Sequence, residues 1–299
     1  MDPAAPPSDP AADAQDRPFD RRLRRLRRDR AAASGGRAAY LHHRAADELV
    51  ERLDLVKREF RTALDLGCGD LYQTGRLRER GLEVTPADPG ARYAAAASGV
   101  QCDEDRLPFA DRAFDLIVSV GLLDSVNDLP GALTLIRRAL RPDGLFLAAF
   151  AGAGSLPRLR QALRAAEEAE AAEKASPRIH PQIDVRAAGD LLGRAGFALP
   201  VVDSETVTVR FPSLARLVDD LRAMGATNLL AARSKRPLGR VALAAAAAEF
   251  AAGADVDGKI AERFEILHLS GWAPSADQPK PARRGSATAS LADALRRPR

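Results

Sequence analysis

A short apolar run that ends in two closely spaced glycines is the first feature whose residue types suggest chemistry. Residues Thr62 to Leu66 precede Gly67-Cys68-Gly69, which is typical of a buried strand that meets a tight turn. Glycines there permit positive φ angles and let the backbone approach a ligand closely. The following helix would direct N–H groups at the carboxylate of an amino-acid moiety, and Asp65 could take its ammonium group. The alternative is a turn with a structural role alone.

Acidic residues follow where a nucleoside would need them. Asp88 lies 23 positions after Asp65, at the end of the next apolar run, where a carboxylate can accept two hydrogen bonds from ribose hydroxyls. As the residue before a Pro-Gly pair, it is otherwise a turn former. Asp103 and Glu104 precede the apolar segment Leu107 to Phe109, so these carboxylates could accept an adenine amino group beside a wall for its ring. The alternative for this segment is a solvated acidic loop.

The elements that must position these residues alternate between strand and helix patterns. After the first strand, short apolar runs recur at Leu82 to Ala87, Phe114 to Val120 and Gly144 to Phe150, and helical stretches separate them. This order predicts right-handed βαβ crossovers and a doubly wound, mainly parallel α/β sheet. Two later strands are expected at Thr206 to Val209 and Arg263 to Leu269.

The organisation along the chain follows from these elements. Between the two late strands lie too many helical residues for a hairpin, which predicts an insertion that could act as a lid. Helices are expected before the first strand, one of them over Tyr40 to Glu59. We divide the chain into a disordered leader (1–18), N-terminal helices (19–60), the core (61–212), the helical insertion (213–262), the last strand (263–272) and a low-complexity tail (273–299).

Composition limits the class of protein. The chain has 299 residues, a formal net charge of +4 and two cysteines, Cys68 and Cys102. Two cysteines exclude a disulfide framework and suit a reducing compartment, so we expect a cytoplasmic protein in which both thiols are packing residues. The leader has no apolar signal segment, and no run of about 18 apolar residues predicts a membrane span.

Metal and nucleic-acid sites are not expected. The four histidines are His42, His43, His180 and His268, and none has the spacing of a redox-metal site with two histidines and a carboxylate. Seven arginines fall between Arg21 and Arg30. Without interleaved aromatic residues, this segment favours a solvated helix over a sheet edge, or a protein partner, rather than nucleic acid.

Five motifs in the same order resemble those of class I methyltransferases. They are Asp65-x-Gly67-x-Gly69, Asp88, Asp103-Glu104-x-x-Leu107-Pro108-Phe109, Phe114-Asp115-Leu116 and Leu140-Arg141-Pro142-Asp143-Gly144. The resemblance implies a seven-stranded Rossmann-like sheet and an S-adenosyl-L-methionine site formed by Asp65, Gly67, Cys68, Gly69, Asp88, Asp103 and Glu104. A nucleotide-binding oxidoreductase is a weaker reading, because the glycine turn lacks a further glycine of the dinucleotide fingerprint.

Further segments are similar to the family of the arginine-hydroxylase assembly factor of respiratory complex I. They are Phe19-Asp20-Arg21, Val126-Asn127-Asp128-Leu129-Pro130, Leu191 to Phe197, Asp220-Leu221-x-x-Met224-Gly225, Gly271-Trp272 and Arg284 to Thr288. This resemblance implies a methyltransferase-like enzyme that acts on a protein partner, such as a complex I subunit, rather than on a small molecule.

Two departures from that family pattern affect the expected site. Leu71 stands where the family has a third glycine, and a side chain there could crowd the methionine end of the cofactor. Asp124-Ser125 replaces a His-Trp pair at the rim of the site. These departures leave a second hypothesis open, a non-catalytic assembly module whose cofactor pocket has decayed.

Methyl transfer makes small demands on the protein, because a sulfonium is already a good leaving group and rate comes from alignment. Residues at and after the end of the fourth strand of a doubly wound sheet line its crevice. Ser119, Asp124 and Ser125 are therefore the candidates that face the methyl group. The acceptor, the choice between methylation and hydroxylation, and the oligomeric state do not follow from the sequence.

Overall fold

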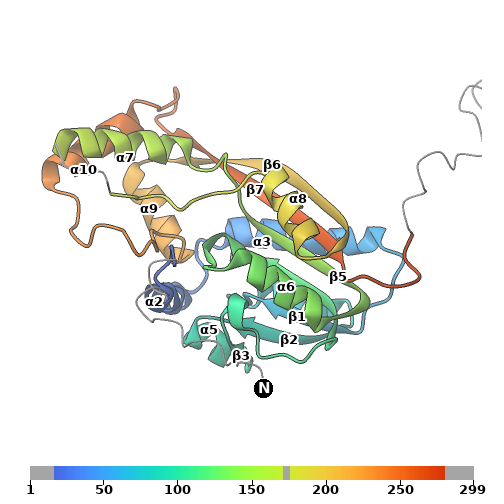
Figure 1. The fold of residues 1–299 in the computed structure, drawn as a ribbon. Coiled ribbons are helices and arrows are strands. Elements are labelled where there is room, and N and C mark those ends of the chain that lie inside the picture. Colours follow the sequence, from blue (N-terminus) through green and yellow to red (C-terminus); the bar gives the residue numbers. More distant parts are fainter. Residues whose placement is uncertain (1–16, 171–175, 280–299) are drawn as a thin grey trace, which may run out of the picture.

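The computed structural model describes residues 17–170 and 176–279, which fold around one seven-stranded sheet (Figure 1). The strand order is β3-β2-β1-β4-β5-β7-β6. All pairs from β3 to β5 are parallel, and β7 runs antiparallel to both of its neighbours. The strands are β1 (Thr62–Leu66), β2 (Glu83–Asp88), β3 (Val100–Gln101), β4 (Phe114–Val120), β5 (Leu140–Ala151), β6 (Ala198–Phe211) and β7 (Ile260–Trp272). The predicted doubly wound, mainly parallel sheet is confirmed.

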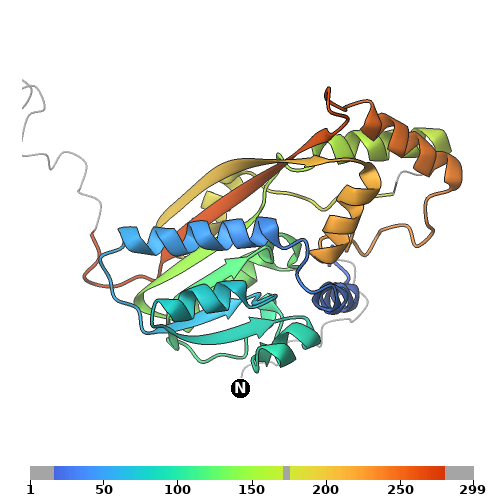
Figure 2. The same cartoon turned by 180° about the vertical axis from the view of Figure 1, so that it is seen from behind.

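Helices cover both faces of this sheet, as the two opposite views show (Figures 1 and 2). The helices are α2 (Arg21–Ala33), α3 (Tyr40–Arg52), α4 (Tyr72–Glu79), α5 (Ala91–Ala96), α6 (Leu129–Ala139), α7 (Pro157–Glu170), α8 (Val185–Arg194), α9 (Leu214–Ala223) and α10 (Arg240–Ala251). Helices α3 and α4 pack on one face, and α6 and α8 pack on the other. Helix α2 contacts α5 and α9, and its first turn lies beside the residues that follow β3.

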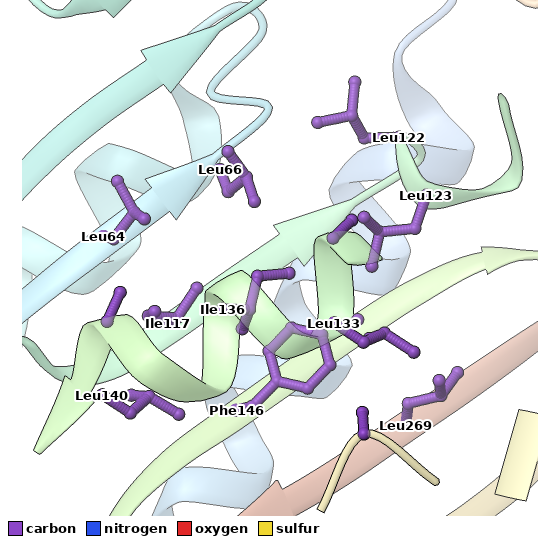
Figure 3. Close-up of a cluster of buried hydrophobic side chains, with 14 of the residues drawn as sticks. Leu64, Leu66, Ile117, Leu122, Leu123, Leu133, Ile136, Leu140, Phe146 and Leu269 are labelled. Carbon is purple, nitrogen blue, oxygen red and sulfur yellow. The ribbon is translucent and has the colours of Figure 1, made fainter. Parts of the chain in front are cut away.

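The central strands are apolar without interruption because both of their faces are buried. In β4, Ile117 packs toward α6 and α8, whereas Leu116 and Val118 pack toward α3 and α4. Figure 3 shows the first of these clusters, in which Phe146 of β5 and Ile136 of α6 fill the space between sheet and helix. Each fully buried side chain of this size contributes about 1.5–3 kcal/mol relative to exposure.

A second, smaller core lies at the far end of β6 and β7, where these strands extend past the rest of the sheet (Figures 1 and 2). Helices α7, α9 and α10 pack there around Phe211, Phe250 and Phe264. Ala162 of α7 and Ala246 of α10 are fully buried, and these small side chains let the two helices approach closely. The helical insertion between the last two strands is therefore present, and it is joined by α7.

Several element limits differ from the sequence expectations. The helix expected over Tyr40 to Glu59 ends at Arg52, and a short 3₁₀ turn follows. Its apolar spacing continues past that point, but Leu55 is exposed rather than packed. Strand β3 has only two residues, too few to give a periodic signal. The last two strands are longer than expected because they pair with each other beyond the core.

Some expectations concern residues outside the described ranges. They are most of the leader (1–18), the last part of the tail (280–299) and the motif Arg284 to Thr288. Residues 273–279 are described, and Ala273 is buried, with its N–H donating to the Gly144 carbonyl at 2.8 Å. No helix within the described ranges has the length and apolar character to cross a membrane.

Candidate functional site

The glycine turn after β1 has the conformation that the sequence predicted. Gly67 and Gly69 have φ angles of +96° and +50°, which L side chains rarely adopt. A Cβ atom on Gly67 would lie 2.8 Å from the Leu122 side chain. The N–H groups of Gly67 and Cys68 donate to the Ala87 carbonyl at 2.7 and 3.1 Å. The turn therefore lies directly against the ends of β2 and β4.

Asp65 holds the start of helix α4 beneath this turn. Its carboxylate is completely buried and accepts from the Gln73 side-chain amide at 2.6 Å and the Thr74 hydroxyl at 2.5 Å. Burial raises the pKa of Asp65 to about 7, although these two hydrogen bonds act in the opposite direction. Asp65 positions the turn, and its contact with an ammonium group stays a prediction.

Asp88 lies at the end of β2, as expected, and joins three segments of the chain. Arg28 of α2 donates to both of its oxygens, at 2.7 and 2.5 Å. The Gly69 and Gly90 N–H groups donate to the same two oxygens at 3.2 and 2.7 Å. The carboxylate is fully buried. It is therefore part of the glycine turn, and an arginine engages it.

The acidic residues after β3 are paired with the same helix. Arg24 donates to both oxygens of Glu104 at 2.7 and 3.0 Å, and both side chains are buried. Arg25 donates to Asp103 at 2.5 Å. We call these groups the arginine–carboxylate cluster; its members are Arg21, Arg24, Arg25, Arg28, Asp88, Asp103, Glu104 and Asp105.

The cluster corrects the view of the arginine-rich segment as a solvated helix. Arg24 and Arg28 are 4% and 8% exposed, because they pair with carboxylates that are themselves buried. The four arginines of the cluster fall at positions i, i+3, i+4 and i+7, which is one face of a helix. That spacing, together with four acids at strand ends, was the signal in the sequence that could have revealed the contact.

Two cavities meet beside the glycine turn. The smaller one has a volume of about 40 Å³ and is bordered by the turn and by Arg28 and Tyr93. The larger one, which we call the chamber, has a volume of about 250 Å³. His42, Val120 and Met224 border both cavities. An acceptor in the chamber would therefore lie next to a ligand at the turn.

The chamber is apolar with a few polar groups. Side chains of α3, β4, β5, α7, α9 and β7 form its walls; among the apolar ones are Leu41, Phe150, Leu159, Leu221, Phe264 and Ile266. Asp124, Arg178 and His180 are among its polar groups. The His180 Nε2 accepts from the Leu229 N–H at 2.9 Å. The sequence indicated no metal-binding role for His42 or His180 and no other role either, but both border this space.

His42 stands at the junction of the two cavities and is neutral at physiological pH. Burial lowers its pKa to about 4, and the positive charge of Arg28 acts in the same direction. Gly121 follows β4 with a φ of +62°, and a Cβ atom there would lie 2.4 Å from the His42 Nε2. A glycine is therefore required for this histidine to occupy the junction.

The three acceptor-side candidates lie in different places. Asp124 borders the chamber. Ser125 is buried, and its hydroxyl accepts from Arg24 at 3.1 Å. Ser119 is buried too, on the face of β4 that Ile117 shares, and its hydroxyl has no hydrogen-bond partner among the described residues. Neither serine is among the described residues that border the two cavities.

Both cysteines are buried. Cys68 borders the smaller cavity, and Cys102 packs in the core beside α6. Burial raises the pKa of both thiols, that of Cys102 to about 12. Within residues 17–170 and 176–279, no three side chains of His, Cys, Asp or Glu lie close enough together to hold a metal ion.

Leu71 does not border the smaller cavity. It has a φ of +70° and lines a neighbouring hollow of about 270 Å³, which Gly69 of the turn also borders. The positive φ explains why a glycine suits this position, since an L side chain pays for it in strain. The expected crowding of the cofactor by this side chain stays a prediction.

The residue types at the turn fit an amino-acid-bearing nucleoside. A backbone turn of positive φ, a strand-end carboxylate and two further buried carboxylates are brought together, which is the set that such a ligand requires. In this conformation, however, arginine side chains hold the carboxylates. The residue types therefore suit this ligand, but arginines of helix α2 occupy the carboxylates that would bind it.

Comparisons with known proteins agree with this geometry. Residues 64–148 match the family model of a methyltransferase domain. The chain is 35% identical to the arginine-hydroxylase NDUFAF5 of Danio rerio over 92% of this chain and 88% of that protein. It is 32% identical to the malonyl-[acyl-carrier protein] O-methyltransferase of Laribacter hongkongensis, over 83% and 88% of the two chains.

A solved structure supports the fold. The YcgJ protein of Bacillus subtilis superimposes with a TM-score of 0.54 at 14% identity, over 79% of this chain and 100% of that one. The sheet, the glycine turn with its strand-end carboxylates and the two relatives all lead to the same assignment. The chain belongs to the class I S-adenosylmethionine-dependent methyltransferase family that includes the arginine-hydroxylase NDUFAF5 proteins.

Proposed function

We propose that this protein transfers the methyl group of S-adenosylmethionine to an acceptor group that a partner protein carries. The observation that supports it is the chamber, which adjoins the glycine turn and shares His42, Val120 and Met224 with the cavity there. In this proposal the chamber holds the acceptor next to the cofactor, between walls that are mostly apolar.

The residues of the chain would act by binding and alignment. When bound, S-adenosylmethionine supplies a methyl group on a sulfonium, a leaving group that needs no acid. The glycine turn and Asp88 would hold the nucleoside, and Asp103 and Glu104 its base. A neutral His42 does not repel the positive sulfonium. Asp124 and His180, which border the chamber, would orient the acceptor.

The two relatives support an acceptor on a protein. One is an O-methyltransferase that acts on malonyl-[acyl-carrier protein], and the other is an arginine hydroxylase. The resemblance to the complex I assembly family favours a subunit of that complex as the partner. The two free, buried cysteines are consistent with a cytoplasmic location, which we include in the proposal.

A non-catalytic assembly module is the second candidate. The observation that favours it is the engagement of Asp88 by Arg28, next to a cavity of only about 40 Å³, a volume that has room for only a few water molecules. Under this hypothesis the chain would bind its partner and transfer no methyl group.

The test measures transfer of a labelled methyl group by the wild type and by a variant in which a larger side chain blocks the chamber. The full chain is incubated with S-adenosylmethionine labelled in its methyl group and with subunits of respiratory complex I, and label in the protein fraction is counted. Ala151, at the end of β5, borders the chamber, whereas Ala153 is exposed. Ala151→Phe should reduce transfer by about tenfold or more, because small displacements of reacting groups are costly. Ala153→Phe is the matched control.

Three results would contradict the proposal. Label that enters only small molecules excludes a protein acceptor. No label, with cofactor binding retained, supports the assembly module. Incorporation of oxygen from labelled O₂ into a partner arginine, without methyl label, identifies hydroxylation as the reaction.

A further inference from the structure

One face of helix α2 covers the acids that the nucleoside half of the cofactor requires. Arg28 binds Asp88, Arg24 binds Glu104, and Arg25 binds Asp103. This face also contacts the residues beside the glycine turn, since Arg24 donates to the Leu122 carbonyl at 3.0 Å. The helix thus lies where an adenosine would have to enter.

The contact between Arg28 and Asp88 uses the acceptor positions that ribose hydroxyls would use. The guanidinium donates to both carboxylate oxygens, and two backbone N–H groups already occupy the same oxygens. Arg28 also lies over the Tyr93 ring, 5.3 Å from its centroid. Its pKa is raised because the charge of Asp88 outweighs the effect of burial. A bidentate guanidinium and two ribose hydroxyls cannot occupy the acceptor positions of this carboxylate at the same time.

Most contacts along the buried face of α2 are charged. Its buried residues are Arg24, Arg28 and Ala31, and Leu26 is 45% exposed. Apolar contact is concentrated at its first turn, where Leu23 packs against Phe19, Leu229 and Leu230. A change that satisfies the buried carboxylates in another way would therefore weaken what holds the rest of the helix.

The two ends of α2 differ in how firmly they are held. At its beginning Phe19 is fixed by paired hydrogen bonds with Asn127, of 2.9 and 3.2 Å. At its end Gly35 and Gly36 have φ angles of +69° and +71° and separate α2 from α3. Adjacent glycines allow such a junction to change direction at low cost.

We infer that helix α2 is an internal competitor for the cofactor site, so that Arg28 and Arg24 must release Asp88 and Glu104 before an adenosine binds. Cofactor affinity is then reduced by the fraction of molecules in which α2 is released. The inference concerns the cofactor alone and holds for any acceptor.

The direction in which a single substitution changes cofactor affinity tests this inference. Binding of S-adenosylhomocysteine is measured by calorimetry for the full chain and for Arg28→Ala, Arg24→Ala and Arg22→Ala. The first two variants should bind about tenfold more tightly or better, because the competing state loses a contact. Arg22 is exposed on the same helix, so Arg22→Ala removes the same charge and should bind like the wild type.

Weaker binding by Arg28→Ala would overturn the inference, since it would mean that Arg28 helps to hold the ligand. Should Arg28→Ala fail to fold, Arg28→Gln and Arg24→Ala retain the test. Hydrogen exchange of the wild-type chain gives a second measurement. Saturating S-adenosylhomocysteine should increase exchange in residues 21–33, whereas increased protection there would show that α2 closes over the ligand.

These outcomes separate the inference from the proposed function. Tighter binding by Arg28→Ala without methyl transfer supports the competitor and contradicts the proposed function. If the wild type binds the cofactor and transfers methyl groups while Arg28→Ala binds the cofactor more weakly, the proposed function is supported and the competitor is contradicted. An absence of binding in every variant contradicts both.

Discussion

At the scale of single residues, the site depends on charged groups that are buried with their partners. Asp88 and Glu104 have no exposed surface, and each forms a bidentate ion pair with an arginine. Removing one partner of such a pair leaves an uncompensated charge, which typically costs about 3–5 kcal/mol. Asp65 differs, because neutral donors surround it, and its protonation therefore depends on pH.

Asp65→Asn should change how stability depends on pH. The pKa of Asp65 is about 7 in the folded chain and about 4 when unfolded. Between these values the unfolded state releases a proton that the folded state keeps, so stability falls as pH rises from about 4 to 7, by about 4 kcal/mol in total. Urea denaturation across this range should show the fall in the wild type and its loss in Asp65→Asn.

The control for that measurement is Asp54→Asn, which changes an exposed carboxylate and should keep the wild-type pH profile. An Asp65→Asn variant with the same fall in stability would show that other groups cause it.

Leu71→Gly tests whether this side chain limits the cofactor. Glycine relieves a positive φ that costs a leucine about 1–2 kcal/mol, and its greater chain entropy offsets about 0.5–1 kcal/mol. Thermal denaturation should therefore show equal or slightly greater stability. Since the side chain does not border the smaller cavity, affinity for S-adenosylhomocysteine should not change. Tighter binding by both Leu71→Gly and Leu71→Ala would show that the side chain crowds the ligand after all.

At the scale of elements, the sequence predicted what lies on strands better than what lies on helices. Gly67 and Asp88 could be located because a parallel strand ends at one edge of the sheet, where its last residues must meet those of its neighbours. Arg28 was not located, because the helical spacing of the arginines alone is the same whether that face meets water or carboxylates, and only its combination with the acids at the strand ends indicates the contact. The extent of β6 and β7 was missed because their antiparallel pairing continues outside the main core.

The contact of α7 with α10 shows how small residues determine an element's position. Ala246 is fully buried where α10 meets α7, whereas Ala247 is exposed. Ala246→Leu should lower the free energy of unfolding by about 1–3 kcal/mol, because a tightly packed contact has no space for three more carbon atoms. Ala247→Leu, measured by the same chemical denaturation, should remain within about 0.5 kcal/mol of the wild type. Equal stability of both variants would mean that the helices are loosely packed.

At the scale of the whole molecule, two cores share the β6–β7 pair, and the chamber lies between them. Its walls come from the sheet, through Phe150, and from the insertion, through Val218 and Leu221. The two parts must therefore keep their relative position for an acceptor to reach the glycine turn. A direct link between them is the hydrogen bond from the Tyr40 hydroxyl of α3 to Asp220 of α9, at 3.1 Å.

Tyr40→Phe should loosen the insertion and leave the sheet intact. The variant keeps the ring and removes one donor from Asp220, which is buried and retains an ion pair with Arg216 at 3.0 Å. Losing such a hydrogen bond costs about 0.5–1.5 kcal/mol. If the insertion opens separately, hydrogen exchange should become faster in α9 and remain unchanged in β1, β4 and β5. A uniform increase across these strands would show instead that sheet and insertion unfold as one unit, so that the chamber cannot open without loss of the cofactor site.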